Sequence, residues 1–405
     1  MRQFKKSSKL NNVAYDVRGP VLDAATAMEA QGAKILKLNI GNPGAFNFEA
    51  PACIIDAMSK NLIASEAYSD SRGILEAREA IAAYAQKRGI ENVSASDVYT
   101  GNGVSELISI CTQALLDSGD EVLIPSPDYP LWTATVTIAG GNAVHYICDE
   151  RSDWMPDLSD IRSKVTARTK AIVVINPNNP TGAVYDRCML EGIIEIAREN
   201  ELVIFSDEIY DRLLMDSIKH TSIASLAPDL FCITLSGLSK SHLIAGYRIG
   251  WALLSGPKEN VKSYIEGINM LSSMRLCSNV PAQHVVKTAL EHQEETDALL
   301  APGGRVYEQR EAICKGLDKI EGISYVRPKA AFYVFPKLDI KSFNITNDEQ
   351  FVLDFLREKH VLLVHGGGFH WNEHDHFRIV YLPEVEVLEE TMKRLGDFLK
   401  TYRQG

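Results

Sequence analysis

Polar side chains that can do chemistry stand at the ends of four apolar runs in this sequence. Lys240 follows the run FCITLS, and Asp207 and Tyr210 stand in SDEIYD, directly after ELVIF. Asn179 belongs to the stiff turn NPNNPTG after KAIVVI, and the glycine-rich segment GNGVSEL follows DVYT. Each feature alone has an ordinary explanation, such as a solvated lysine, a helix N-cap or a rigid turn. Their joint occurrence at successive run ends favours one shared site.

The runs themselves are typical of buried strands in a mostly parallel sheet. KAIVVIN, ELVIFSD and FCITLS are short and rich in β-branched residues, and DRCMLEGIIEIAREN between the first two has the pattern of a helix. Buried strands that alternate with helices predict an α/β fold with a sheet covered on both faces. Ligands bind outside the carboxyl ends of such strands, where the polar side chains above are expected to meet.

The pattern changes along the 405 residues, a length that indicates two domains. The alternating pattern begins at about residue 73, and residues 46–290 are expected to form a large, cofactor-binding domain. Residues 291–405 combine long helices with short strands such as AFYVF and FRIVYL, which predicts a smaller α+β domain. Residues 1–45 are expected to form an N-terminal arm and part of the small domain.

Composition excludes several classes of partner. The net charge is −11 and no basic cluster stands out, so we expect no nucleic-acid partner. No apolar run approaches the roughly 20 residues that span a bilayer, so no membrane partner is expected. Seven scattered cysteines without a C-x-x-C pair, and a start without a secretory signal, predict a cytoplasmic protein with reduced thiols.

The residue types at the run ends are those that pyridoxal phosphate chemistry requires. A lysine amine can form a Schiff base with the cofactor aldehyde, and a carboxylate keeps the pyridine nitrogen protonated. A glycine-rich helix start supplies backbone N–H groups for a phosphate, and Arg248, eight residues after Lys240, can complete that site. The glycine spacing of GNGVSEL does not match a dinucleotide or P-loop motif.

NPNNPTG, SDEIY and the pair SGLSK and GYRIG together resemble the motifs of class I, fold-type-I aminotransferases, over essentially the whole chain. The resemblance implies the fold of PLP-dependent transferases, pyridoxal 5'-phosphate as cofactor, and Lys240 as the catalytic lysine that forms the Schiff base. The implied cofactor contacts are Asp207 at the pyridine nitrogen, Tyr210 and Asn179 at the phenolic oxygen, Tyr129 stacked on the ring, and Gly103, Val104, Ser105, Ser239 and Arg248 at the phosphate.

The same resemblance implies a homodimer with shared active sites, in which Tyr68 reaches the phosphate of the neighbouring subunit. It also implies that Arg378 binds the substrate α-carboxylate, assisted by Asn179 and by the backbone N–H of Gly41. One position departs from the pattern. Gly237 stands where many relatives have a phosphate-binding serine, so the remaining phosphate ligands are expected to carry more of the binding.

Longer segments, among them KSSKLNNVAYDVRGPVLDAA and LNIGNPGAFNFEAP, resemble bacterial glutamate–pyruvate (alanine) aminotransferases. This likeness implies small-molecule substrates: L-alanine and pyruvate on one side, L-glutamate and 2-oxoglutarate on the other, in a ping-pong reaction. Tyr15 and Arg18 are candidates for a substrate-facing lid, and an ordinary dimer-surface arm is the alternative. An aromatic (tyrosine-type) aminotransferase, a PLP-dependent lyase on the same fold, and a regulatory protein that kept the fold are the other interpretations.

The histidine-rich segment HGGGFHWNEHDHF raises the question of a metal. It contains His365, His370, His374 and His376, at spacings that do not match a zinc motif. We therefore expect no metal site.

Overall fold

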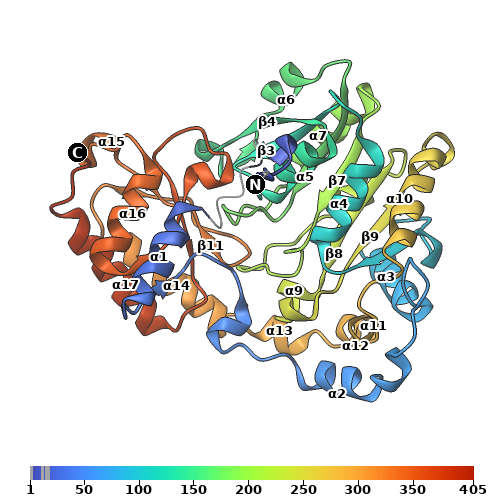
Figure 1. The fold of residues 1–405 in the computed structure, drawn as a ribbon, viewed down its shortest axis with the longest axis horizontal. Coiled ribbons are helices and arrows are strands. Elements are labelled where there is room, and N and C mark those ends of the chain that lie inside the picture. Colours follow the sequence, from blue (N-terminus) through green and yellow to red (C-terminus); the bar gives the residue numbers. More distant parts are fainter. Residues whose placement is uncertain (1–2, 11–12, 14–18) are drawn as a thin grey trace.

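The structure is a computed structural model that describes residues 3–10, 13 and 19–405. Its largest sheet within these residues has eight strands (Figure 1). In chain order they are β2 (Val98–Gly101), β3 (Glu121–Ser126), β4 (Asn142–Asp149), β5 (Met155–Pro156), β6 (Thr169–Ile175), β7 (Val203–Asp207), β8 (Cys232–Gly237) and β9 (Gly250–Ser255). Their spatial order is β2-β9-β8-β7-β6-β3-β4-β5. Strands β8, β7, β6, β3 and β4 pair in parallel, whereas β9 and β5 run antiparallel to their neighbours.

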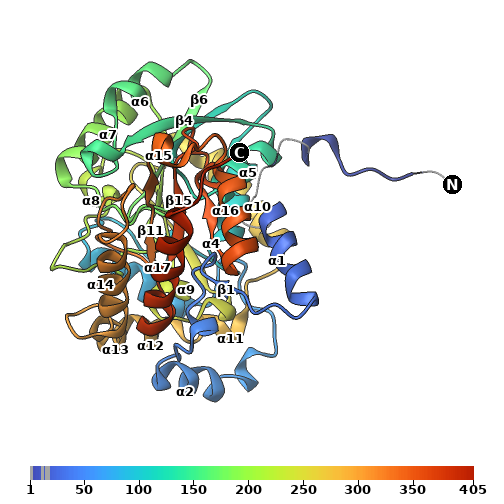
Figure 2. The same ribbon diagram turned by 90° about the vertical axis from the view of Figure 1, so that its left-hand side faces the viewer.

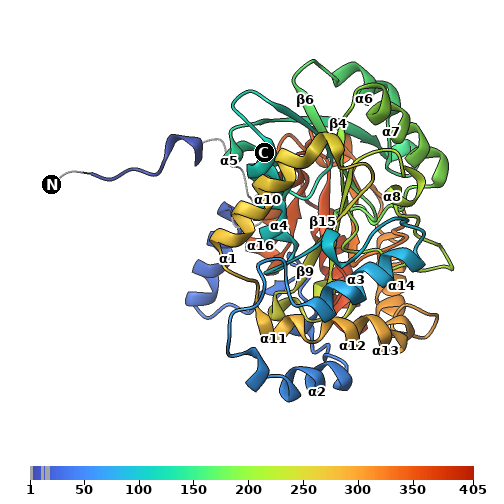
Figure 3. The same ribbon diagram turned by 90° about the vertical axis from the view of Figure 1, so that its right-hand side faces the viewer.

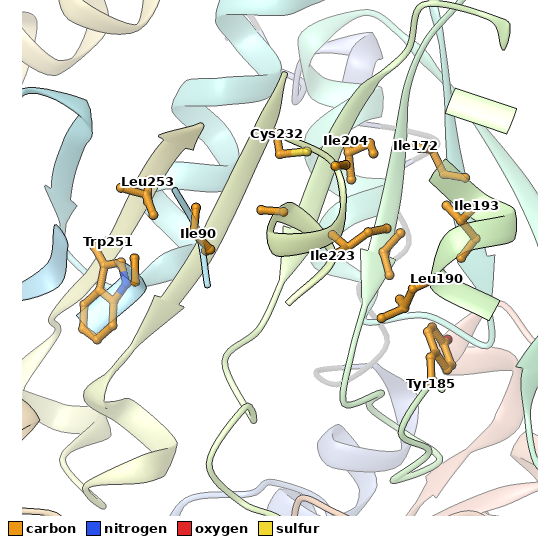
Figure 4. Close-up of a cluster of buried hydrophobic side chains, with 14 of the residues drawn as sticks. Ile90, Ile172, Tyr185, Leu190, Ile193, Ile204, Ile223, Cys232, Trp251 and Leu253 are labelled. Carbon is orange, nitrogen blue, oxygen red and sulfur yellow. The ribbon is translucent and has the colours of Figure 1, made fainter. Parts of the chain in front are cut away.

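Most of both faces of this sheet is buried. Alternate residues of a strand point to opposite sides, so one strand can contribute to two cores. In β3, Val122 and Ile124 enter one apolar core and Leu123 enters the other. The first core is completed by α4 (Val104–Leu115), α5 (Leu131–Ala139) and α10 (Lys262–Met274). The second core, drawn in part in Figure 4, is completed by α3 (Leu75–Lys87), α6 (Leu158–Lys164), α7 (Arg187–Glu199), α8 (Ile223–Leu226) and α12 (Val286–Glu291). With most of both faces covered, the ends of the strands are where a ligand site is expected.

A third core joins the two ends of the chain. Helix α1 (Pro20–Ala30) lies beside α16 (Asp348–Lys359) in Figures 1 and 2, and β1 (Leu36–Lys37) pairs in parallel with β13 (Val361–Leu362). The same core contains α14 (Arg305–Leu317), α17 (Val385–Leu399), β11 (Tyr333–Val334) and β15 (Phe377–Val380). The third strand of their sheet, β14 (Val364–His365), places Val364 in the second core. Helix α1 and strand β1 therefore pack with the last hundred residues rather than with the large sheet.

Shorter elements complete the fold. They are η1 (Ser8–Leu10), η3 (Pro43–Phe46), α2 (Ala52–Lys60), η4 (Ile63–Ser65), η5 (Ala95–Asp97), η6 (Glu150–Ser152), α9 (Leu238–Ser241), η7 (Ala245–Tyr247), η8 (Glu259–Val261), α11 (Val280–Gln283), α13 (Glu294–Ala298), β10 (Ile323–Ser324), β12 (Lys337–Leu338), α15 (Ile340–Phe343) and η9 (Gly366–Phe369). Residues 3–7 extend away from the rest of the chain in Figures 2 and 3, whereas η1 contacts α5. Among the described residues, no helix is long and apolar enough to span a membrane.

The predicted α/β fold with a mostly parallel sheet is confirmed. Strand β4 was not predicted. Its sequence NAVHYICD has only two buried residues, since the strand lies near the sheet edge next to β5 and exposes part of one face. The hydrophobic pattern that marks a buried strand is therefore weak there.

Candidate active site

A cavity of about 370 Å³ opens at the carboxyl ends of β6, β7 and β8. Eleven of the residues proposed from the sequence line it: Gly41, Val104, Ser105, Tyr129, Asn179, Asp207, Tyr210, Ser239, Lys240, Arg248 and Arg378. The remaining wall is largely apolar, with Ile40, Ile108, Ile175, Ile209, Ala245 and Tyr333. Residues from four strand ends and from both ends of the chain thus meet around one space.

Lys240 lies in the short helix α9, three residues after the end of β8. Its side chain is half-buried and enters the cavity, where Nζ donates a hydrogen bond to the Gly41 carbonyl oxygen at 2.5 Å. The amine is therefore fixed by the strand on one side and held by the N-terminal segment on the other.

Asp207 is the last residue of β7, and its side chain is buried at the cavity wall. Oδ2 accepts a hydrogen bond from the indole Nε1 of Trp132 at 3.0 Å, and Oδ1 accepts one from the Ile209 amide at 3.3 Å. Burial raises the pKa of Asp207 to about 6, because desolvation disfavours the charged carboxylate more than these two donors favour it. A cation in the cavity beside this carboxylate would lower its pKa again.

Tyr210 follows on the loop after β7, and its hydroxyl lies 2.9 Å from the Tyr333 hydroxyl. Burial, and next the charge of Tyr333, raise the pKa of Tyr210 well above the ordinary value of 10. The Tyr210 hydroxyl consequently stays protonated at neutral pH and can donate a hydrogen bond into the cavity.

Arg378 enters the cavity from β15, on the side opposite the large sheet. Its Nη1 donates to Asn179 Oδ1 at 2.9 Å, and its Nη2 donates to the Asn39 carbonyl oxygen. The guanidinium lies 4.6 Å from the ring centre of Tyr333 and 4.5 Å from that of Phe369. Two aromatic faces and two fixed acceptors hold this cation in one orientation, which suits recognition of a planar carboxylate.

The start of α4 and Arg248 form the opposite end of the cavity. Gly103 has φ of 83°, and a Cβ at this position would overlap with the Arg248 guanidinium, so the backbone and the arginine can approach only because this residue is glycine. Arg248 donates to the carbonyl oxygens of Ala245 and Asn102, at 2.8 and 3.1 Å. Free N–H groups at a helix start beside a fixed arginine make a site for an anion.

The departure at Gly237 has a packing explanation. Gly237 is paired with Gly250 between β8 and β9, and a Cβ on Gly237 would come within 2.8 Å of the Gly250 Cα and of the Ile249 oxygen. Both obstacles are backbone atoms, which cannot move aside cheaply. The close contact of the two strands therefore accounts for the missing serine.

Two of the described residues proposed from the sequence, Gly103 and Tyr68, do not line the cavity. Tyr68 is 79% exposed in the chain. Tyr15 and Arg18 lie outside the described residues.

The four histidines of the C-terminal segment do not converge. His370 contacts Asp128, His376 contacts Asp375, and both His365 and His374 approach Asp348. A different group, Asp128, His145 and His370, brings its polar atoms within 4.8 Å of one another.

Hydrogen bonds within that group explain its closeness. Asp128 accepts from His370 at 2.8 Å and from the Thr133 hydroxyl at 2.7 Å, and Thr133 lies 2.9 Å from His145. The two imidazole rings stack at 18°, so their nitrogen lone pairs run nearly parallel rather than toward one point. This arrangement does not suit a metal ion.

Sequence reasoning did not identify Tyr333, Asn39 or Trp132 as part of the site. Tyr333 stands in the apolar run AFYVF, where it looks like a core residue, and Asn39 contributes only its carbonyl. A buried tyrosine or tryptophan whose polar atom needs a partner was the available signal.

The donor set fits a phosphorylated pyridine aldehyde. Such a group needs an amine for its aldehyde, a carboxylate for its ring nitrogen and an anion site for its phosphate. Lys240, Asp207 and the α4 start with Arg248 offer these groups around one cavity. The raised pKa of Asp207 supports the fit, since a buried carboxylate without a cationic partner is stabilised by a protonated ring nitrogen.

The chain is similar to known proteins over nearly its whole length. A model of the family described as aminotransferase class I and II matches residues 33–395. The glutamate-pyruvate aminotransferase AlaA of Haemophilus influenzae is 56% identical over 404 residues, covering 100% of both chains. The crystal structure of an aminotransferase from Escherichia coli has a TM-score of 0.98 at 54% identity, covering 100% of both chains. An alanine aminotransferase from Pyrococcus furiosus has a TM-score of 0.91 at 40% identity, with 98% of this chain and 100% of that chain covered.

Proposed function

Since this chain belongs to the class I and II aminotransferases, we propose that it moves an amino group between L-alanine and pyruvate on one side and L-glutamate and 2-oxoglutarate on the other, with pyridoxal 5'-phosphate as cofactor. One observation carries the proposal: the Lys240 amine, the Asp207 carboxylate and the Arg378 guanidinium line the same cavity. The substrate pair is supported by the names of the relatives, which are glutamate-pyruvate and alanine aminotransferases.

At the phosphate we propose the backbone N–H groups of Gly103, Val104 and Ser105, the Ser239 hydroxyl and the Arg248 guanidinium. The close approach of Arg248 to Gly103 supports this assignment, because it brings the guanidinium beside the start of α4, where Val104 and Ser105 line the cavity. Without a serine at position 237, Ser239 is the hydroxyl after β8 that remains for the phosphate.

Around the ring we propose Asp207 at the nitrogen, Tyr129 on one face, and Tyr210 with Asn179 at the phenolic oxygen. All four line the cavity. Tyr210 keeps its proton, so it can donate to a phenolate oxygen and stabilise that charge. Tyr129 adds a flat, partly buried aromatic surface of the kind that stacks on a ring.

When bound, pyridoxal phosphate supplies an aldehyde that carries the amino group and a ring that withdraws electrons from the substrate α-carbon. We assign the proton transfers at that carbon to Lys240. Once it has released the Gly41 carbonyl, its Nζ would take the proton from the substrate α-carbon and return it later in the transfer. The apolar isoleucines of the wall exclude water from this transfer.

Arg378 is proposed to bind the α-carboxylate of the amino acid through a bidentate pair, with Asn179 and the Gly41 N–H beside it. Its present acceptor, the Asn39 carbonyl, is the contact that a substrate carboxylate would replace. For the glutamate side chain we propose Arg18, with Tyr15, as a lid that pairs with the second carboxylate and leaves room for the methyl group of alanine.

We further propose that the protein works as a cytoplasmic homodimer, in which Tyr68 completes the phosphate site of the partner subunit. In the single chain, large apolar side chains are exposed from α2 to the start of α3, the segment that contains Tyr68, and in α10 and just after it. They are Ile55, Leu62, Ile63, Leu75, Met270, Met274 and Leu276. Exposed large apolar side chains are typical of surfaces that another protein covers. The division into an arm with part of the small domain (1–45), a large domain (46–290) and a small domain (291–405) remains our proposal.

An amino-acid panel with pyruvate or 2-oxoglutarate as acceptor tests the proposal. Rapid transfer between alanine and 2-oxoglutarate supports it. Rapid transfer from tyrosine or phenylalanine with poor alanine turnover would identify an aromatic aminotransferase instead. Release of ammonia without an acceptor would identify a lyase, and absence of any turnover with bound cofactor would leave the regulatory interpretation. Arg18→Ala should weaken the binding of glutamate more than the binding of alanine. An equal loss of affinity for the two amino acids would refute the lid.

A further inference from the structure

The Trp132 side chain forms a hydrogen bond with Asp207, which lines the cavity. Trp132 is the second residue of α5, is fully buried, and does not line the cavity itself. Its indole Nε1 donates to Asp207 Oδ2 at 3.0 Å, across 75 residues of sequence. The indole N–H is a donor with no acceptor function, so this bond has a fixed direction.

The indole is held in place independently of Asp207. Its ring packs against Phe205, with ring centres 5.4 Å apart at 44°, inside the core of α4, α5 and the sheet. The Trp132 amide donates to the Tyr129 carbonyl at 3.0 Å, which starts the helix. The first turn of α5 and the residues just before it therefore place both the Tyr129 ring in the cavity wall and the Trp132 indole N–H beside Asp207.

Within the described part of the chain, Trp132 is the one side chain that donates a hydrogen bond to Asp207, and no lysine, arginine or histidine forms an ion pair with it. The other donor is the Ile209 amide, at a longer 3.3 Å. The ionisable groups that share the cavity are Tyr129, Tyr210, Tyr333, Lys240, Arg248 and Arg378, and Glu208 adjoins Asp207 in the chain. Glu208 acts against ionisation of Asp207, whereas the Trp132 and Ile209 donors act for it.

A neutral donor has a specific consequence at this place. A histidine would bind the carboxylate as a cation, compete with the ring nitrogen for its negative charge, and lose its own proton near pH 6.5. The indole orients the carboxylate and leaves its whole charge for the ring nitrogen. We propose that Trp132 is the positioning residue that fixes the Asp207 carboxylate for the cofactor nitrogen and, because it neither gains nor loses a proton, does so equally across the working pH range. The proposal rests on the proposed function, since it takes pyridoxal phosphate as the ligand of this cavity.

The cofactor-free wild-type protein provides the first test. With nitrogen-labelled tryptophan, the indole N–H resonance of Trp132 should shift with pH, with a midpoint near the Asp207 pKa of about 6. In Asp207→Asn the same resonance should not titrate in this range. A Trp132 resonance that is indifferent to pH in the wild type, or that titrates equally in Asp207→Asn, would overturn the proposal.

Variants provide the second test. Trp132→Phe should raise the midpoint of the Asp207 titration by about one to two pH units, which corresponds to the loss of a hydrogen bond to a charged group. Infrared difference spectra, with Asp207→Asn as the reference, measure this midpoint. The affinity of Trp132→Phe for pyridoxamine phosphate at pH 7 should fall about tenfold. Trp132→His should bind pyridoxamine phosphate more tightly than Trp132→Phe, but its affinity should change with pH around pH 6.5, where the new histidine titrates.

Trp154→Phe is the matched control, since Trp154 is equally buried but packs on Phe335, Trp371 and His376. If the two phenylalanine variants lost cofactor affinity equally and the midpoint of the Asp207 titration did not change, Trp132 would contribute only packing, and the proposal would fail. Failure of the wild type to bind pyridoxamine phosphate would refute the proposed function instead, while the cofactor-free titration would still decide whether Trp132 controls Asp207.

Discussion

The Nζ of Lys240 donates a hydrogen bond to the carbonyl oxygen of Gly41, a residue that precedes it by 199 positions. Two residues before Gly41, the Asn39 carbonyl accepts from Arg378. Backbone carbonyls of one short N-terminal segment therefore hold two cations that face the cavity. A substrate carboxylate that binds Arg378 competes with the Asn39 carbonyl, and a reacting Lys240 must leave the Gly41 carbonyl.

Gly41→Ala is expected to disturb the site through Tyr333. A Cβ at position 41 would overlap with the Tyr333 hydroxyl, which contacts Tyr210. We expect the KM for amino acids to rise about tenfold or more, since overpacking of this kind typically costs about 1–3 kcal/mol. Steady-state kinetics of Gly41→Ala with and without Tyr333→Phe measure the effect. Removing the hydroxyl should restore part of the loss, and an additive, larger loss in the double variant would contradict the steric explanation.

Gly237→Ser is expected to destabilise the protein rather than improve phosphate binding. The added side chain meets the backbone of Ile249 and Gly250, where β8 and β9 are closest. A loss of about 1–3 kcal/mol in the free energy of unfolding is expected. Gly44→Ser, where a Cβ meets nothing within 4 Å, is the control for thermal unfolding. Tighter pyridoxamine phosphate binding with unchanged stability in Gly237→Ser would refute the packing explanation.

Residues far apart in sequence also meet in a buried ionic group that should make stability depend on pH. His376 lies 2.5 Å from Asp375 and 3.5 Å from Glu150, and Lys337 contacts both carboxylates. Burial acts to lower the pKa of His376, but the bond to Asp375 and the charge of Glu150 raise it overall. A raised histidine pKa stabilises the fold below the unfolded value near 6.5 and loses this effect as pH rises through the folded value.

Thermal unfolding of wild type and His376→Gln at pH 6 and pH 9 measures that contribution. At pH 6 the free energy of unfolding of the wild type should exceed that of His376→Gln by about 1.5–3 kcal/mol, the range for hydrogen bonds to charged groups. At pH 9 the difference should be clearly smaller. His374→Gln is the control, because the His374 side chain is mostly exposed. A wild-type advantage that stays constant with pH would count against the titration of His376.

Tyr68 is expected to act on the partner subunit, and mixed dimers test this. Tyr68→Ala and Lys240→Ala should each be poorly active as pure proteins. A hybrid of the two subunits has one site with both defects and one intact site if Tyr68 acts across the interface. Refolded or co-expressed mixtures should then exceed the summed activity of the two parents. No gain on mixing would show that Tyr68 serves its own chain or none.

The strand ends of the site were predictable because parallel strands carry their loops to one edge, so Asp207, Asn179 and Lys240 had to come near each other. The roles of Arg378 and Tyr129 depended on family resemblance, since nothing local distinguishes them from core residues. Trp132, Tyr333 and Asn39 escaped prediction for another reason. Their contacts join residues 75 to 339 positions apart, and such pairings follow from tertiary packing rather than from local pattern.

We propose that the protein transfers amino groups with Lys240 as its catalytic lysine. Transfer of labelled nitrogen from L-glutamate to pyruvate tests this proposal most directly. Wild-type protein loaded with pyridoxal phosphate should produce labelled alanine and an equal amount of 2-oxoglutarate, without ammonia. Lys240→Ala, which loses its proton-transfer group, should be slower by at least about 10²–10⁴-fold. Labelled alanine formed at the same rate by Lys240→Ala, or labelled ammonia in place of alanine from the wild type, would contradict the assignment.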